Sequence, residues 1–272
     1  MKTLQNHTIL YDDECPMCRE YTKAFVKSGM LDEKGREAFT KMPSCEIPNL
    51  DWNRARNEIA LINRKDHSVK YGVDSILTII ESSFPFLKSI FRFKPFYFLL
   101  TRLYFFISFN RKVIAPGKVF EGANTCTPDM NIKYRWAYIV FAWGVTSFIL
   151  VHYFRLGAPL VPESGFVREF LVCAGQLIFQ AAIVAIFRRG RVIHYLGNVM
   201  TVSLAGALAL SPVFLLTGWI KSNWFYIFYF MIVVSAMFFE HKRRVKILEL
   251  PVIVSFTWVL YRFLILFFLI LK

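Results

Sequence analysis

The chain has 272 residues, of which 56% are hydrophobic and only 19% are charged. That composition is too apolar for an ordinary soluble protein and indicates a membrane protein. The net charge of +14 is uneven, because residues 1–84 carry −1, residues 85–133 carry +6 and residues 134–272 carry +9. A basic excess in the apolar part favours anionic lipid headgroups over nucleic acid as a partner. Five cysteines, an odd number without regular spacing, exclude a disulfide-stapled secreted domain.

The first eighty residues alternate short β-like and helix-like segments. We expect strands over residues 4–11, 37–42, 58–63 and 68–71, the last two paired as a hairpin. We expect helices over residues 16–30 and 74–83, and between them a short helix that begins with a cap at Asn49 or Asp51. This order, β-α-β-α-β-β-α, predicts a thioredoxin-like α/β domain over residues 1–115.

Two cysteines, Cys15 and Cys18, lie where the first strand passes into the first helix. Pro16 suits the first helical position, which places Cys15 beside the unpaired N–H groups and the positive end of the helix dipole. That environment stabilises a thiolate, the reactive form of cysteine. Cys18 is three residues further on the same face, so it can resolve a mixed disulfide formed at Cys15. The pair therefore predicts a redox-active dithiol.

Two other interpretations stay open for this pair. A zinc site needs about four ligands, and Cys45, His7 and His67 are too scattered to supply the other half. The two cysteines could also be inert. We expect neither a metal nor a cofactor, because the chain has no glycine-rich phosphate loop and no second C-x-x-C motif.

Asp12, Cys15 and Cys18 form the pattern D-x-x-C-x-x-C, which resembles the DCC family of thiol-disulfide oxidoreductases. Tyr71-Gly72-Val73-Asp74-Ser75 is similar to the glycine turn of that family, although alanine is usual where this chain has Ser75. Tyr104 and Asn110-Arg111 are similar to its closing residues. The resemblance covers residues 5–115 and implies a thioredoxin-like fold and redox activity. Ala55-Arg56-Asn57 is a departure, because thioredoxin-like folds usually carry a cis-proline there.

Three acidic residues lie beside the cysteines. Asp12 either caps the turn after the strand or accepts the proton of Cys18 during exchange, and the family resemblance favours the second role. Asp13 and Glu14 oppose the helix dipole, so we expect the Cys15 thiol to be less acidic than in a strong oxidant. This favours a reductase or exchange role.

Phe84–Phe109 is aromatic but interrupted by prolines and basic residues. Its longest run without a charged residue is too short to span a membrane. We therefore expect either amphipathic helices at the membrane surface or helices packed in the domain. Turn signals at Pro116-Gly117 and Thr127-Pro128-Asp129 fall in a loop-like stretch over residues 110–133, and we place a linker at residues 116–133.

Residues 134–272 predict an all-α transmembrane bundle. The expected spans are Tyr134–Phe154, Phe170–Phe187, Leu196–Leu216, Trp224–Phe239 and Pro251–Leu271. Nine Lys and Arg residues flank one side of these spans and four flank the other, which places the first side inside the cell. No signal peptide opens the sequence. We therefore expect a multi-pass protein of the bacterial inner membrane with a cytoplasmic N-terminal domain.

Four further residues carry weaker expectations. Cys45 and Cys126 are candidate additional thiols, and Cys173 is expected to be a buried apolar residue of the second span. Arg262 lies midway along the fifth span, where it either binds an anionic headgroup or a carbonyl, or else extends its charge to the interface.

The sequence thus predicts a membrane-anchored thiol-disulfide oxidoreductase with Cys15, Cys18 and Asp12 as its catalytic residues. Its partners would be a thiol or disulfide substrate, either a protein or a small molecule, an external thiol donor of electrons, and the lipid bilayer. One alternative is a membrane transport or binding module whose N-terminal domain senses redox state or binds metal. Another places the redox domain outside the cell as a factor in oxidative folding.

Overall fold

The computed structural model describes residues 2–41, 49–117, 128–158, 160, 165–220 and 222–270. The chain divides into two compact units, Met1–Tyr134 and Arg135–Lys272. The first unit is an α/β domain and the second is entirely helical. Each unit is described by itself.

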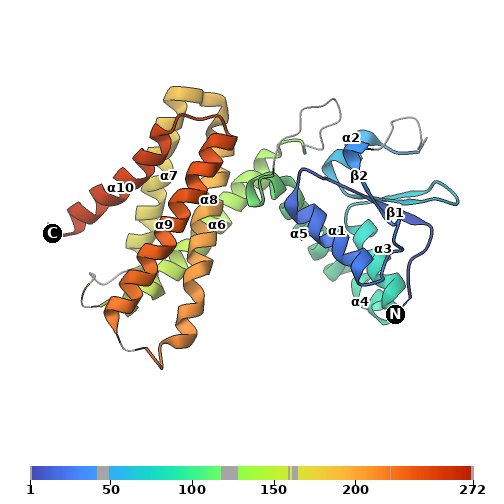
Figure 1. Cartoon of the computed structure of the whole chain (residues 1–272), viewed down its shortest axis with the longest axis horizontal. Coiled ribbons are helices and arrows are strands. Elements are labelled where there is room, and N and C mark those ends of the chain that lie inside the picture. The colour runs from blue at the N-terminus through green and yellow to red at the C-terminus, as the bar shows by residue number, and fades with distance from the viewer. Residues whose placement is uncertain are drawn as a thin grey trace. The chain divides into compact units, whose positions relative to one another are not determined.

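The first unit is built on a mixed four-stranded sheet in the order β2-β1-β3-β4 (Figure 1). Strand β1 (His7–Tyr11) pairs in parallel with β2 (Arg36–Ala38) and antiparallel with β3 (Ala60–Asn63). Strand β3 in turn pairs antiparallel with β4 (Val69–Tyr71). Helix α1 (Pro16–Lys27) joins β1 to β2, α2 (Trp52–Asn57) precedes β3, and α3 (Val73–Ser83) follows β4. The predicted thioredoxin-like order of elements is confirmed.

Alternating side chains place a helical layer on each face of this sheet. Leu10 and Ile62 pack with the residues of α2 on one face, while Ile9 and Leu61 pack with those of α1 and α3 on the other. Because successive strand residues point to opposite faces, two separate cores form from adjacent positions. Helices thus pack on both faces of the sheet, and they fix the position of the end of β1, which the two cysteines follow.

Some predicted boundaries differ from the structure. The second strand is shorter than expected and passes into a 3-10 turn at Phe39–Lys41. Helix α1 ends at Lys27, because Gly29 adopts a positive φ of 73° that closes the helix. Asp51, not Asn49, caps α2, since its carboxylate accepts a hydrogen bond from the N–H of Arg54 at 3.0 Å.

The aromatic stretch after α3 forms a 3-10 turn (Pro85–Leu87), the short helix α4 (Lys88–Phe91) and the long helix α5 (Lys94–Ile114). Pro95 lies in the first turn of α5, where proline is compatible with a helix. The C-terminal half of α5 is buried against the domain, whereas its N-terminal half exposes large apolar side chains. Residues 110–114 belong to this helix, so the loop begins later than residue 110.

The second unit consists of α6 (Ile132–Leu156), α7 (Phe166–Arg188), α8 (Val192–Leu210), α9 (Asn223–Ile247) and α10 (Ile253–Ile270). Arg188 at the end of α7 and Arg191 just after it pair with Glu249 after α9, so these two turns meet at one end of the bundle. Asn223 at the start of α9 donates a hydrogen bond to Ala158 after α6, at the other end. The helices therefore run up and down.

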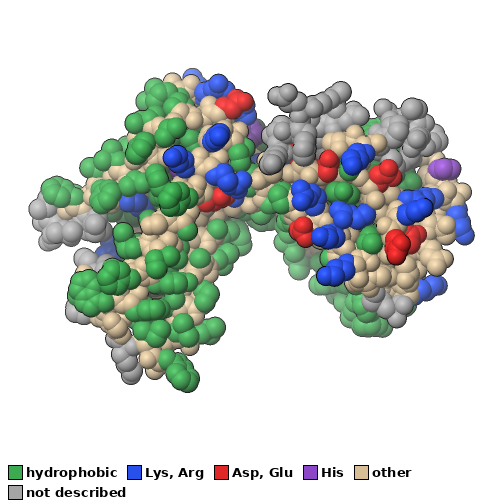
Figure 2. All heavy atoms as spheres, viewed as in Figure 1, with side chains coloured by type: hydrophobic (Ala, Val, Ile, Leu, Met, Phe, Trp, Pro, Cys, Tyr) green, Lys and Arg blue, Asp and Glu red, His purple; other side chains and the backbone are tan. Residues whose placement is uncertain are grey.

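Three helical stretches are long and apolar enough to cross a membrane: Ile132–Leu156, Phe166–Leu216 and Asn223–Ile247. The second comprises both α7 and α8, which pack against each other, and Ile253–Ile265 is a shorter apolar helix. Large apolar side chains cover the outside of this unit, as Figure 2 shows. Such a surface fits lipid, so the chain is a membrane protein. The count of five spans stays a prediction.

Candidate active site

Cys15 and Cys18 lie at the junction of β1 and α1, as the sequence predicts. Cys15 occupies the N-cap position of α1, with Pro16 in the first turn and no side-chain cap. Its N–H donates to the carbonyl oxygen of Asp12 at 3.2 Å, which closes the turn. Both thiols are free and buried, Cys15 at 0% exposure and Cys18 at 6%. The positive end of α1 therefore acts on Cys15 within a nearly dry environment.

The two cysteines differ in acidity. A hydrogen bond from the Cys18 side chain is the main cause that lowers the pKa of Cys15 to about 7, against the opposing effect of burial. The same hydrogen bond and burial raise the pKa of Cys18 far above its usual range. Near neutral pH, a substantial fraction of Cys15 is therefore ionised, whereas Cys18 stays protonated. This asymmetry is what a nucleophilic and a resolving cysteine require.

The lowered pKa predicts the pH profile of Cys15 alkylation. Because only the thiolate reacts, the rate should rise with pH and reach half its maximum near pH 7, whereas an ordinary thiol would do so at about 8.5. Mass spectrometry of the Cys15 peptide after timed iodoacetamide treatment measures this rate. A midpoint near that of an ordinary cysteine would contradict the assignment of the thiolate to Cys15.

A buried ion pair lies directly beside the cysteines. The Nε of Arg111 is 3.1 Å from a carboxylate oxygen of Asp12, and the two side chains are 6% and 2% exposed. Lys112 lies 3.3 Å from the same carboxylate and 2.7 Å from the carboxylate of Glu14. Helix α5 thus brings two cations to the acidic turn that precedes Cys15. The opposite charges compensate one another at a position where Asp12 and Arg111 are almost completely buried.

The acidic residues act on Cys15 differently from the sequence-based expectation. Asp12 is the carboxylate that raises the pKa of Cys15, and Arg111 lowers it. Asp13 instead accepts a hydrogen bond from Thr40 at 2.7 Å, and Glu14 is paired with Lys112. A pKa of about 7 is still well above that of a strong oxidant. The Cys15 thiol is therefore moderately acidic mainly because the hydrogen bond from Cys18 outweighs the effect of burial, and Asp12 and Arg111 add smaller, opposing contributions to its pKa.

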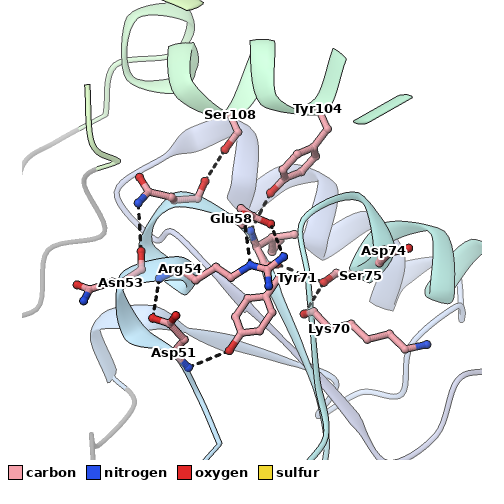
Figure 3. A network of polar contacts seen from close by, with 12 residues as sticks. Asp51, Asn53, Arg54, Glu58, Lys70, Tyr71, Asp74, Ser75, Tyr104 and Ser108 are labelled. Carbon is pink, nitrogen blue, oxygen red and sulfur yellow. Dashed lines mark hydrogen bonds and ion pairs between the residues drawn. The ribbon is translucent and has the colours of Figure 1, made fainter. Parts of the chain in front are cut away.

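Helix α5 also satisfies the backbone at the end of α2, where the cis-proline of thioredoxin-like folds is missing. Arg111 donates to the carbonyl oxygens of Arg56 at 2.7 Å and Asn57 at 3.3 Å. Ser108 donates to the carbonyl of Asn57 at 2.7 Å, and the Tyr104 hydroxyl accepts from the N–H of Ile59 at 2.8 Å (Figure 3). These bonds fix the segment that faces the cysteines without a proline.

The glycine turn before α3 completes this frame. Gly72 has a φ of 62°, and a Cβ there would collide with the carboxylate of Glu58. Ser75, where alanine is usual in the similar family, is fully buried and donates to the carbonyls of Ile59 at 3.2 Å and Lys70 at 2.7 Å. The serine hydroxyl is therefore accommodated by hydrogen bonds, and its presence does not disturb the site.

The chain after α5 covers the turn that carries Cys15. Gly117 lies so close to this turn that a Cβ on it would overlap the carbonyl group of Glu14 and contact the ring of Pro16. Only glycine fits there. This contact accompanies the complete burial of Cys15, so a substrate reaches its sulfur only when the local packing opens.

We predict that Gly117→Ala speeds the alkylation of Cys15. The overlap with Glu14 should cost about 1–3 kcal/mol, which shifts the local opening equilibrium roughly tenfold to a hundredfold. The rate should rise by a similar factor at constant pH, again measured on the Cys15 peptide. Gly165→Ala is the matched control, because a Cβ there meets nothing. Equal rates in wild type and Gly117→Ala would show that residue 117 does not restrict access.

The other described candidate residues belong to the second unit. Cys173 is a buried residue of α7, as expected, and Arg262 is half-buried in α10. Cys45 and Cys126, like Lys221 and Lys272 among the flanking charges, lie outside the described residues. In the described ranges, no three His, Cys, Asp or Glu side chains group as a metal site would require.

Sequence reasoning missed the contacts of Arg111 and Lys112 with the acidic residues beside Cys15. Arg111 is identified from the sequence only by its similarity to the closing residues of the family, and no local sequence feature predicts its contact with Asp12, which is 99 positions away.

A polar cluster in the second unit was also missed. The Tyr195 hydroxyl lies 2.8 Å from Gln180 and 2.8 Å from His241, whose other ring nitrogen is 3.2 Å from Ser255. Polar side chains buried in membrane helices are costly and often functional.

A dithiol at the start of a helix, after the first strand of a mixed four-stranded sheet, defines the thioredoxin-like class. Residues 9–115 match the family model described as DCC1-like thiol-disulfide oxidoreductase. The match ends within the first unit and leaves the helical unit outside it. Comparison with curated proteins gave no match, and comparison with solved structures gave none either. The family therefore supports thiol-disulfide oxidoreductase activity for the α/β domain.

Proposed function

We propose that this protein is a membrane-anchored thiol-disulfide oxidoreductase that uses Cys15 and Cys18 for dithiol-disulfide exchange. The observation that carries the proposal is the asymmetric thiol pair at the N-terminus of α1, with a pKa of about 7 at Cys15 and a hydrogen bond from Cys18. The family match of residues 9–115 supports it.

The cycle begins when the Cys15 thiolate attacks a substrate disulfide. The substrate S–S bond breaks, a mixed disulfide forms at Cys15, and the departing sulfur takes a proton. Cys18 then loses its proton and attacks the Cys15 sulfur, which releases the second substrate thiol and leaves a Cys15–Cys18 disulfide. Two electrons have passed to the substrate. An external thiol donor returns them and restores the dithiol.

Asp12 is our candidate for the proton acceptor. Cys18 has a raised pKa, so its attack requires a base, and Asp12 and Cys18 line the same cavity. The ion pair with Arg111 holds the carboxylate of Asp12 in position. On Cys18 attack, the proton passes to Asp12, and the charge of Arg111 remains to stabilise the site.

Turnover tests the proposal directly. Purified full-length protein in detergent is supplied with reduced glutathione as donor and 2-hydroxyethyl disulfide as acceptor, and glutathione oxidation is followed. Catalytic amounts of wild-type protein should accelerate the exchange. A rate equal to that of the protein-free buffer would contradict an enzyme and leave the alternative of a redox-sensing module. Tight retention of zinc would favour that alternative as well.

We further propose that the α/β domain faces the cytoplasm of a bacterial cell. The basic residues Arg188, Arg191 and Lys246 lie toward the end of the bundle where the α7–α8 and α9–α10 turns meet, as the positive-inside rule requires of a cytoplasmic end. A Ser28→Cys reporter in a cysteine-free background should react with an impermeant thiol reagent only after the membrane is opened. A Gly165→Cys reporter, at the opposite end, should react in intact cells. The reverse pattern would place the domain outside.

The buried polar cluster of the second unit favours a second candidate function, a membrane binding or transport module. Tyr195, His241 and Ser255 are each 0–1% exposed and joined by hydrogen bonds within apolar helices. The two candidates differ in turnover. A module of this kind would show no disulfide exchange above buffer, even with both cysteines intact.

A further inference from the structure

A cavity of about 430 Å³ opens beside Cys18 in the α/β domain. Its walls come from α1, α3 and α5, from the end of β1 and from the segment between α2 and β3, and they are largely apolar. The apolar and aromatic side chains in its lining include Met17, Tyr21, Phe25, Ile76 and Ile107. A volume of this size falls in the range of small-ligand sites. The cavity therefore has room for a group attached to a sulfur atom that reacts at the cysteine pair.

The charges in this cavity are compensated within the domain. Asp12, Glu58 and Arg111 line it. Asp12 and Arg111 pair with each other at 3.1 Å, and Glu58 pairs with Arg54 at 3.3 Å. Lys112 provides Asp12 with a second cation at 3.3 Å. A carboxylate or ammonium group on a ligand would have to compete with these contacts and lose its own hydration. The cavity thus favours an uncharged, apolar group.

An exposed apolar stripe leads along α5 to the cavity. Leu99, Leu103 and Ile107 follow one another at four-residue spacing, so they lie on one face of the helix. Leu99 is 60% exposed and Leu103 is 50% exposed, whereas Ile107 lines the cavity. Apolar surface therefore continues from the outside of the domain to the wall that contains Cys18.

We propose that this cavity is the substrate pocket and that it selects disulfides carrying an apolar group next to the sulfur. The inference rests on the proposed function and adds the class of substrate. Cys15 is fully buried and hydrogen-bonded to Cys18, so the sulfur under attack must come close to the cavity that Cys18 lines. The apolar group fills the space between Ile76 and Ile107 while the Cys15 thiolate breaks the disulfide.

The test uses acceptors that differ only in polarity. Di-n-propyl disulfide and 2-hydroxyethyl disulfide have the same length and the same dialkyl S–S bond, but a methyl group replaces each hydroxyl. With full-length protein in detergent and reduced glutathione as donor, kcat/KM for the propyl compound should exceed that for the hydroxyethyl compound at least about tenfold. The variant Ile107→Ser should remove most of this preference. Ile90→Ser, an exposed position of α4 outside the cavity, should retain it.

The apolar group can come from a small molecule or from a peptide side chain. A second arm therefore compares the disulfide dimers of N-acetyl-Cys-Phe-amide and N-acetyl-Cys-Ser-amide. A preference for the phenylalanine compound that Ile107→Ser removes would support the pocket with a peptide source, and a preference limited to the propyl compound would support it with a small-molecule source. Equal rates in both pairs, or a preference unchanged in Ile107→Ser, would overturn the inference while the proposed function stands. No turnover of any acceptor would overturn both.

Discussion

Replacement of Cys15 by serine should abolish disulfide turnover by this protein. The serine hydroxyl does not ionise near neutral pH, whereas the Cys15 thiol has a pKa of about 7 and supplies the nucleophile. Loss of a nucleophile typically costs an enzyme more than a thousandfold in rate, and we expect at least that for Cys15→Ser (~10³-fold). The measurement is glutathione oxidation with 2-hydroxyethyl disulfide as acceptor. The change is small in volume, so the domain should remain folded.

Two further variants make this result specific. Cys173→Ala removes a buried thiol that belongs to the second unit, and it should leave turnover unchanged. Cys18→Ser should retain the attacking thiol but stop the cycle after the first step, so that a mixed disulfide at Cys15 accumulates and is visible as added mass. Full turnover in Cys15→Ser would refute its role as nucleophile. Accumulation at Cys18 in the Cys15→Ser variant would reverse the two assignments.

Substitution of Arg111 by glutamine should strongly destabilise the α/β domain. Arg111 pairs with Asp12 while both are nearly inaccessible, so its loss leaves a buried carboxylate with less compensation. Breaking such a pair costs about 3–5 kcal/mol in the free energy of unfolding. Arg111→Gln also weakens the hydrogen bonds to the carbonyls of Arg56 and Asn57. Alkylation of Cys18 at increasing urea concentrations reports the unfolding of this unit alone.

The matched control is Arg92→Gln. Arg92 also bridges two carboxylates, those of Asp74 and Glu81, but its side chain is 43% exposed. An exposed ion pair contributes about 0–1 kcal/mol, so the urea midpoint should shift little. Asp12→Asn in the Arg111→Gln background should recover part of the loss, because it removes the uncompensated charge. Equal effects of Arg92→Gln and Arg111→Gln would contradict the importance of the buried pair.

Arg111→Gln should also change the reactivity of Cys15. The positive charge of Arg111 lowers the pKa of Cys15, and Asp12 raises it. Without Arg111 the balance favours the protonated thiol, so the alkylation midpoint should move upward from about pH 7. A smaller fraction of Cys15 would then be ionised at neutral pH, and turnover should fall. This is a readout that a purely structural role of Arg111 would not produce.

The local part of the site could be predicted from the sequence. The strand before Cys15, the proline after it and the three-residue spacing to Cys18 are all short-range features, and the structure places them as expected. The order of strands and helices was equally accessible, because alternating apolar residues and turn signals mark each element. The same local chemistry limits the cap of α2 to Asn49 or Asp51, and the structure shows that Asp51 is the cap.

Long-range contacts set the limit of that prediction. The pairing of Asp12 with Arg111 joins positions 99 residues apart, and no spacing rule points to it. The aromatic stretch from Phe84 was ambiguous for a physical reason. Its two halves have similar composition, but tertiary packing buries the half that contains Tyr104 and Arg111 and leaves Phe98 exposed. Contact with the membrane surface stays a prediction for the exposed half.

Small residues of α8 allow a close helix contact in the second unit. Gly206 and Ala207 are buried, and a Cβ on Gly206 would collide with Met237 of α9. The polar cluster around His241 was not foreseen, because its members come from four helices and are isolated in the sequence. Hydropathy locates apolar helices, but their mutual orientation determines which polar side chains meet.

The most direct test of this account is a redox titration of the Cys15–Cys18 pair. Full-length protein is equilibrated in glutathione buffers of graded potential, free thiols are alkylated, and the mass of the cysteine peptide is measured. We predict a reversible two-electron transition between dithiol and disulfide at a thioredoxin-like potential, about −270 mV. If no disulfide forms at any potential, the pair is not a redox centre and the proposed function is wrong.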